Sequence, residues 1–300
     1  DPNFPNATAI EERPLFEKSV NVDRSQPKYS PDHKKVAFVQ DRNNLMVMDV
    51  ATKSVKQLTD SSIFPQRGDD MAFEWSPDGR WIVMEAILSG REPYTDILLV
   101  NVETGEKIPV TQTGYFDGQP RWALDGQAIL FLSERYGMRN HASWGSMYDA
   151  MLVFLNQEAY DKFRLSEEDY ALKKEVEKAS KKDEKKEGKN DKKNIKDKKK
   201  SDDDSDKPKI TPTVVEVDGL EERIVRLTPN SSDMDDAIIT PDGETLYYLT
   251  TFEKGQDLWK ISLRKYETKL LSKLHGKKLR LYLDGKGDNL FLAGPARIKK

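Results

Sequence analysis

The chain contains three histidines, His33, His141 and His275, the side chains best suited to acid–base chemistry near neutral pH. No two of them have the spacing of a metal-binding pair. His33 occupies the glycine position of a tight turn, and His275 lies in a turn before Gly276. We therefore interpret both as exposed loop residues.

His141 lies in a stretch, residues 134–146, that combines basic, aromatic and hydroxyl side chains. Ser143 and Ser146 are close enough in sequence to suggest a nucleophile–base pair. Adjacency in sequence does not provide the geometry of a catalytic triad, and the Gly-x-Ser-x-Gly elbow is absent. We predict no catalytic residue and interpret the stretch as a structural or surface-recognition loop. Its recognition residues would be Arg135, Tyr136, Arg139, His141 and Trp144.

The sequence gives little support for a calcium, phosphate or thiolate site. Residues 284–289, with the sequence Asp-Gly-Lys-Gly-Asp-Asn, faintly resemble a calcium loop but lack the glutamate at the twelfth position. There is no glycine-rich phosphate loop. The chain has no cysteine, which excludes disulfides and thiolate sites. We predict no metal and no cofactor, and we interpret residues 284–289 as a turn.

The elements that would position these residues are marked by a turn that occurs four times. From Pro31 to Pro77 is 46 positions, from Asp78 to Asp125 is 47, and from Asp125 to Asp242 is 117, which is one more repeat with roughly 70 inserted residues. Proline and glycine suit the corners of such turns, and aspartate bonds back to nearby backbone. The four turns are Ser30-Pro31-Asp32-His33, Ser76-Pro77-Asp78-Gly79, Ala123-Leu124-Asp125-Gly126 and Thr240-Pro241-Asp242-Gly243.

Short β-branched, aromatic and aliphatic runs surround each turn. An apolar or aromatic pair precedes the turn, a strand such as Trp81-Ile82-Val83-Met84 follows it, and two more strands complete the repeat. Four strands in each 40 to 50 residues predict a β-propeller blade. A β-sandwich or a β-solenoid with regular turns is the alternative. We predict an all-β propeller segment with about four recognisable four-stranded blades.

The repeats also give the boundaries that we expect. Blades should span about 25–62, 71–113, 118–230 and 235–275, and partial blades should span 1–24 and 279–300. Because the chain starts at Asp1 and its last repeat is incomplete, we expect a piece of a longer protein.

A charged insertion, 166–209, falls within the third repeat. Ser166 followed by three acidic residues predicts a helix start, and good helix formers continue to about residue 187. Beyond Gly188 nearly all residues are charged or polar, a composition typical of disorder. The segments on both sides, Met151–Leu155 and Thr213–Val217, resemble strands. We interpret the insertion as a solvated excursion from a blade, with an interaction tail as the alternative.

The overall charge limits the choice of partners. The formal net charge is −3, which predicts neither nucleic-acid binding nor attraction to a membrane surface. No apolar run approaches the roughly 20 residues that span a bilayer.

Several blocks of the sequence resemble a known family. The repeats with Ser-Pro-Asp or Thr-Pro-Asp-Gly are similar to the WD40-like repeats of TolB-type propellers. More narrowly, the order of four blocks resembles bacterial homologues of tricorn protease, and the resemblance covers nearly the whole chain. These blocks are 41–47, 135–146, 153–163 with the lysine-rich insertion after it, and 223–229.

The resemblance implies the later part of the second propeller of such a protein. The serine peptidase machinery of the family lies in C-terminal domains, so no catalytic residue carries over to this chain. The resemblance further implies a gate or sieve for peptides and unfolded segments. It also implies a periplasmic location, although the archaeal enzyme is cytosolic, so that cytoplasm stays an alternative.

Three functions stay open. The first is a non-catalytic propeller of a tricorn-like serine peptidase, acting in substrate access or assembly, where open inner strand edges could hold peptide by strand addition. The second is a free-standing TolB-like propeller that docks envelope proteins. The third, a propeller enzyme, would need clustered acids, histidines or metal ligands on the inner strands, and none is evident. The exposed edge near 279–300 could pair with another copy, giving a homo-oligomer.

Overall fold

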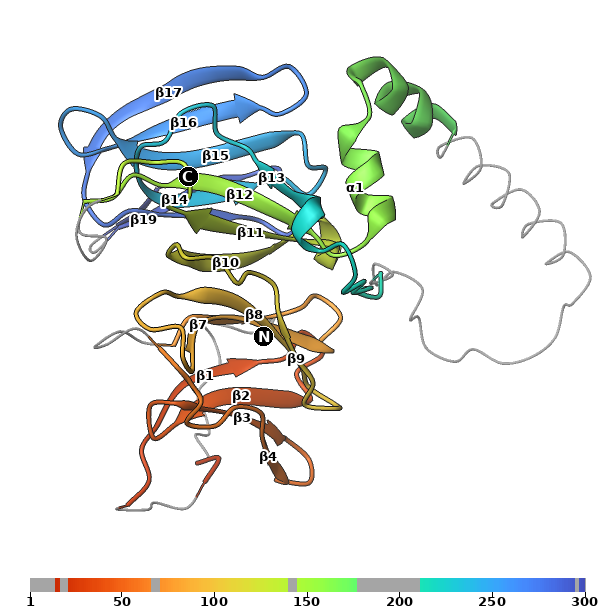
Figure 1. The fold of residues 1–300 in the computed structure, drawn as a ribbon, viewed down its shortest axis with the longest axis vertical. Coiled ribbons are helices and arrows are strands. Elements are labelled where there is room, and N and C mark those ends of the chain that lie inside the picture. The colour runs from red at the N-terminus through yellow and green to blue at the C-terminus, as the bar shows by residue number, and fades with distance from the viewer. Residues whose placement is uncertain are drawn as a thin grey trace, which may run out of the picture.

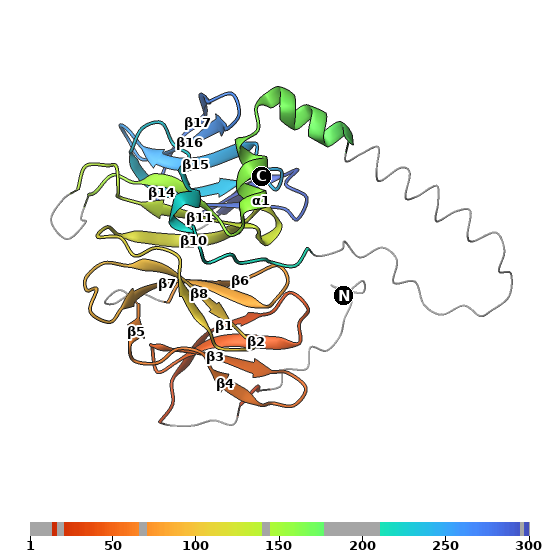
Figure 2. The same ribbon diagram turned by 45° about the vertical axis from the view of Figure 1, so that its right-hand side comes forward.

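The computed structural model describes residues 14–16, 21–65, 71–139, 145–176, 211–294 and 297–299. Five antiparallel sheets follow one another along the chain and stack face to face (Figures 1 and 2). Within the sheets the strands are ordered as in the sequence, from an inner first strand to an outer last strand. This is the arrangement of consecutive propeller blades.

The first sheet contains β1 (Arg24–Tyr29), β2 (Lys35–Gln40), β3 (Asn44–Asp49) and β4 (Val55–Gln57). The second contains β6 (Phe73–Trp75), β7 (Trp81–Leu88), β8 (Asp96–Asn101) and β9 (Lys107–Pro109), and β5 (Ile63–Phe64) also pairs with β7. The third contains β10 (Asp117–Ala123), β11 (Ala128–Ser133), β12 (Asp149–Phe154) and β13 (Ile224–Arg226).

The fourth sheet contains β14 (Asp233–Ile239), β15 (Thr245–Thr251), β16 (Gln256–Ser262) and β17 (Glu267–Gly276). The fifth contains β18 (Arg280–Leu283), β19 (Leu290–Gly294) and β20 (Arg297–Lys299). The helices with defined bounds are α1 (Gln157–Arg164) and two 3-10 turns, η1 (Leu124–Gly126) and η3 (Glu221–Arg223). The predicted fold class, an all-β propeller segment, is confirmed.

The repeated turns join the first and second strands through a shared hydrogen-bond pattern. In the second sheet the Ser76 hydroxyl donates to Asp78 Oδ1 at 2.6 Å and accepts from the Trp81 backbone N–H at 2.9 Å. Ser30 and Thr240 make the same two bonds in their own sheets. The sequence motif therefore recurs because one hydroxyl fixes both the turn and the start of the next strand.

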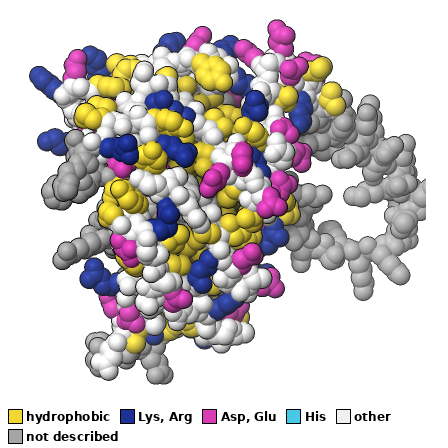
Figure 3. Space-filling view, in the orientation of Figure 1, with side chains coloured by type: hydrophobic (Ala, Val, Ile, Leu, Met, Phe, Trp, Pro, Cys, Tyr) yellow, Lys and Arg dark blue, Asp and Glu magenta, His cyan; other side chains and the backbone are white. Residues whose placement is uncertain are grey.

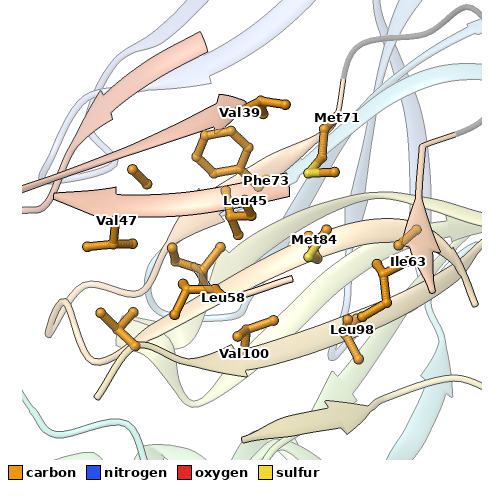
Figure 4. Packing of buried hydrophobic residues seen from close by; sticks show 14 of the residues in the cluster. Val39, Leu45, Val47, Leu58, Ile63, Met71, Phe73, Met84, Leu98 and Val100 are labelled. Atoms are coloured by element: carbon orange, nitrogen blue, oxygen red, sulfur yellow. The ribbon is translucent and has the colours of Figure 1, made fainter. Parts of the chain in front are cut away.

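Apolar side chains fill the space between successive sheets. Ile82 and Met84 of β7 pack against the first sheet, whereas Trp81 and Val83 of the same strand pack against the third. Figure 4 shows the first of these layers, where Val39, Leu45 and Val47 meet residues of the second sheet. Each middle sheet is thus buried on both faces, which explains why its strands are apolar without alternation.

The chain leaves the third sheet after β12 and rejoins it at β13, and the predicted insertion lies in this connection. Helix α1 begins directly after β12, and Asn156 Oδ1 caps it by accepting from the Ala159 backbone N–H at 2.9 Å. Residues 167–176 are also helical, and Ser166 Oγ accepts from the Asp169 N–H at 3.1 Å, which confirms the predicted helix start. The remainder of the predicted helix and of the insertion lies outside the described residues.

The strand expected over residues 213–217 is not formed. The place beside β12 is taken by β13, which pairs with Met151, Leu152 and Val153. The returning segment instead runs past the end of β12, where the Glu216 N–H donates to the Leu155 carbonyl at 2.7 Å. It is also held by Asp78, which accepts from the Thr213 N–H at 2.8 Å.

Charged side chains of both signs are interspersed over the face seen in Figure 3, and no region of that face carries one sign alone. Among the described residues, no helix has the length and apolarity required to cross a membrane.

Buried carboxylates tie the outer strands together at the end of the sheets opposite the repeated turns. Asp149, the first residue of β12, is fully buried and accepts from Thr228 Oγ1 and Ser231 Oγ, each at 2.7 Å. The Arg226 guanidinium neutralises it at 2.9 Å. Asp96, the first residue of β8, is held in the same way by Arg91 at 2.6 Å.

Replacing Asp149 with asparagine should therefore lower the free energy of unfolding by about 3 kcal/mol, because Arg226 loses its partner in a buried setting. Urea unfolding followed by circular dichroism measures the change. Asp288→Asn, at an exposed turn position, is the matched control and should change stability by less than about 0.5 kcal/mol. Equal effects of the two substitutions would contradict this role for Asp149.

Candidate functional site

The inner strands β1, β6, β10, β14 and β18 each pair with one other strand in the described part of the chain, which leaves their second edge free of strand pairing. Contacts between β6 and β10, β10 and β14, and β14 and β18 bring these four strands into one continuous surface. Strand β1 joins it through the hydrogen bond from Lys28 to the Phe73 carbonyl. We call the polar residues of this surface the axial wall. Its members are Lys28, Glu74, Arg121, Asp236, Arg280 and Tyr282.

Three members of the axial wall hold equivalent positions, two residues before Ser30, Ser76 and Ala123, and each reaches into a following sheet. Lys28 Nζ donates to the Phe73 carbonyl at 2.6 Å. Glu74 Oε2 accepts from the Trp122 backbone N–H at 3.0 Å. Arg121 Nη1 donates to the Leu281 carbonyl at 2.9 Å. Side chains therefore join the inner strands of different sheets, which do not pair with one another through their backbones.

Two tryptophans strengthen this connection in the opposite direction. Trp75 Nε1 donates to the Lys28 carbonyl at 3.0 Å, and Trp122 Nε1 donates to the Glu74 carbonyl at 3.1 Å. Each tryptophan directly precedes the first residue of a repeated turn, Ser76 or Ala123. The same hydrogen bond between neighbouring sheets therefore recurs with the sequence repeat.

Asp236 is the most deeply buried member of the axial wall, with 1% of its surface exposed. It accepts from the Leu281 N–H at 2.7 Å and pairs with Arg121 at 3.0 Å. Burial raises the pKa of Asp236, although Arg121 and the Leu281 N–H act to lower it. This carboxylate fixes β14 against β18.

Charges along the wall alternate in sign, from Lys28 through Glu74 and Arg121 to Asp236 and Arg280. Desolvation raises the pKa of Glu74, whereas the Trp122 N–H, Arg121 and Lys28 act to lower it. Desolvation also lowers the pKa of Lys28, opposed by Glu74. Because each charge has an opposite neighbour, the wall has no strong field of one sign.

A cavity of about 260 Å³ opens in the axial wall. Tyr282 stands at its edge with 52% of its surface exposed, and the Arg121 guanidinium lies 5.9 Å from the tyrosine ring centroid. The lining residues are Glu74, Arg121, Trp122, Leu130, Ile238, Ile239, Tyr282 and Leu283. This lining includes no serine or histidine, so the cavity is suited to binding a side chain and provides no nucleophile–base pair.

The described part of the predicted recognition loop lies at the end of the sheets opposite α1 (Figures 1 and 2). Arg135 and Arg139 both approach the ring of Tyr115, with guanidinium carbons 5.9 Å and 4.7 Å from its centroid. The guanidinium carbon of Arg226 lies 4.9 Å from the ring centroid of Tyr136. The structure thus joins three predicted residues to Tyr115 and Arg226, which sequence reasoning did not identify.

The other residues singled out from the sequence are less informative. His141 and Trp144 lie outside the described residues. His33 and His275 are exposed and have positive φ angles, as turn residues do. Residues 284–289 form the turn between β18 and β19, in which Asp284 Oδ1 accepts from the Asp288 backbone N–H at 2.8 Å. Among the described residues, no cluster of three or more His, Asp or Glu side chains could hold a metal ion.

Asp117 lies beneath the recognition loop, with 1% of its surface exposed. It accepts from Thr113 Oγ1 at 2.9 Å, but no Lys or Arg among the described residues pairs with it. Burial therefore raises the pKa of Asp117, and the nearby Asp96 carboxylate raises it further.

The stacked four-stranded sheets and the axial wall define a β-propeller. No family model matches the chain. It resembles part of tricorn protease, with a TM-score of 0.59 at 12% identity over 92% of this chain and 24% of that chain. It is also similar to a puromycin-hydrolyzing peptidase of Mycobacterium tuberculosis, with a TM-score of 0.50 at 12% identity over 93% of this chain and 38% of that one.

The chain is also similar in sequence to a curated protein. The uncharacterized peptidase YuxL of Bacillus subtilis (strain 168) is 30% identical over 115 residues, which are 36% of this chain and 17% of that protein. The chain therefore spans about a quarter of tricorn protease and less of YuxL. The resemblance to tricorn protease expected from the sequence is confirmed at the level of the fold.

Asp117→Asn should change how stability depends on pH. Because the pKa of Asp117 is raised in the folded state, that state binds the proton more tightly than the unfolded chain does. The free energy of unfolding of the native protein should therefore fall relative to that of the Asp117→Asn variant as the pH rises from about 4 to about 7. Urea unfolding of both proteins across this range measures the difference, and a constant difference would contradict the assignment.

Proposed function

We propose that this chain is the non-catalytic propeller part of a tricorn-like serine peptidase, and that it controls the access of peptides and unfolded protein to an active site elsewhere in the parent protein. The axial wall carries the proposal, because it offers a binding cavity on the inner strands without a nucleophile–base pair. The fold shared with tricorn protease and the sequence match to a peptidase support it. The proposal includes a periplasmic parent.

The axial wall would contact a passing chain mainly through side chains. Several backbone groups on the open edges already have partners, since Phe73 accepts from Lys28, Trp122 donates to Glu74, and Leu281 bonds to Asp236 and Arg121. Strand addition therefore has fewer free groups than the sequence suggested. Four side chains of the axial wall are exposed, namely Lys28, Glu74, Arg280 and Tyr282.

Alternating charge suits a passage for varied sequences. A wall of one sign would hold oppositely charged peptides and repel others, whereas paired charges favour neither. The hydrogen bonds between blades also hold these side chains in place, so that little ordering is required when a peptide arrives.

The purified chain alone should hydrolyse neither casein nor short fluorogenic peptides, because the peptide bond would be cut by other domains. The full-length gene product, assayed in parallel, is the positive control and should cleave both. Serine-dependent turnover by the chain alone would refute the proposal, as would a gene that ends soon after residue 300.

In the full-length protein, Tyr282→Ala should lower kcat/KM for casein by about two- to tenfold, because an aromatic contact contributes about 0.5–1.5 kcal/mol. Hydrolysis of short peptides, which need less of the passage, should change little. Tyr266→Ala, which removes an 88% exposed tyrosine between β16 and β17, is the matched control and should leave both rates unchanged. Equal loss for long and short substrates would argue against a role in access.

A further inference from the structure

Two guanidinium groups converge on one tyrosine ring. Arg139 and Arg135 lie 4.7 Å and 5.9 Å from the centroid of Tyr115. Within the described ranges, neither guanidinium makes a hydrogen bond or an ion pair, and both arginines are exposed. Like charges gathered on one ring, with all their donors unused, form a preorganised site for an anionic group.

Nearby carboxylates do not satisfy these arginines. Asp96 is paired with Arg91, and Asp149 is paired with Arg226. Asp117 is almost completely buried, and between it and Arg135 lies a cavity of about 10 Å³, close to the volume that one water requires. Asp96 and Asp149 are thus already paired with other arginines, whereas Arg135 and Arg139 are exposed.

A cleft of about 370 Å³ extends from Arg135 and Tyr115 along the connection between β9 and β10. Its walls are the segment from Thr111 to Tyr115, together with Glu221, Glu222 and Ile224. The cleft therefore has a basic and aromatic part and an acidic part. A polyanion would be repelled by Glu221 and Glu222, whereas a peptide with a single carboxylate beside neutral or basic residues is complementary to both.

We propose that Tyr115, Arg135 and Arg139 form a binding site for a carboxylate of a peptide, either an acidic side chain or a free C-terminus. The forked donors of the two guanidiniums match the two oxygens of a carboxylate, and Tyr115 holds both planes in position. This inference rests on the proposed function, which supplies peptides as ligands. It adds a site of defined chemistry at the end of the propeller opposite the repeated turns.

Fluorescence anisotropy with labelled peptides tests the site on the purified chain. Three peptides share a neutral sequence: one is N-acetylated and C-amidated, one has a single glutamate and an amidated end, and one has a free C-terminal carboxylate. The glutamate peptide or the free-carboxylate peptide should bind at least about tenfold more tightly than the neutral one, and the stronger of the two identifies the source of the carboxylate.

The double variant Arg135→Gln/Arg139→Gln should remove this advantage, while Arg135→Lys/Arg139→Lys should keep part of it because charge remains without the forked donors. Arg42→Gln, which removes an exposed arginine from the turn between β2 and β3, should leave binding unchanged. Circular dichroism confirms that each variant is folded. Because the substituted arginines are exposed, we expect every variant to fold.

Equal binding of all three peptides, or an unchanged advantage in the glutamine variant, would overturn the inference. Tighter binding of a single-stranded oligonucleotide than of the best peptide would also overturn it. Failure here is distinguishable from failure of the proposed function. If only the carboxylate site is wrong, Tyr282→Ala still lowers casein hydrolysis by the full-length protein. If only the proposed function is wrong, the carboxylate peptides still bind, although the full-length protein hydrolyses neither casein nor short peptides.

Discussion

The structure depends on one constraint, that each middle sheet must be apolar on both faces because sheets stack against it from two sides. In β7, Ile82 and Met84 pack toward the first sheet while Trp81 and Val83 pack toward the third. With both faces taken by apolar contacts, polar groups are confined to the strand ends and to the open inner edge. The turns, the buried carboxylates and the axial wall all occupy these remaining places.

The same constraint explains how the inner strands are held together. In the described part of the chain, the inner strands of different sheets do not pair through their backbones. Their inner edges are instead joined by side chains that reach across. Lys28, Glu74 and Arg121 do this from equivalent positions, and Trp75 and Trp122 bond back. A repeat of about 46 residues thus sets a repeated contact between blades, although the side-chain chemistry differs from one blade to the next.

Local features could be predicted from the sequence, whereas contacts between distant segments could not. The turns and strands follow from hydroxyl, proline and apolar residues within a few positions of one another. Helix α1 was missed because it directly follows a strand, although Asn156 is a recognisable cap. Residues 213–217 have the composition of a strand, but β13 takes the partner that they would need. Tyr115 was overlooked because it meets Arg135 and Arg139 only through the fold.

Strand β10 connects the two regions to which we assign binding. Tyr115 precedes this strand at the end opposite the repeated turns, and Arg121 and Trp122 lie near its other end in the axial cavity. A bulge between Gly118 and Arg121 alters the register along the way. The six positions from Tyr115 to Arg121 correspond to about 20 Å of extended chain. A peptide of similar length whose carboxylate is bound by Arg135 and Arg139 would therefore reach the cavity beside Tyr282. Strand β10 would then align the bound peptide from the carboxylate site toward the axial wall.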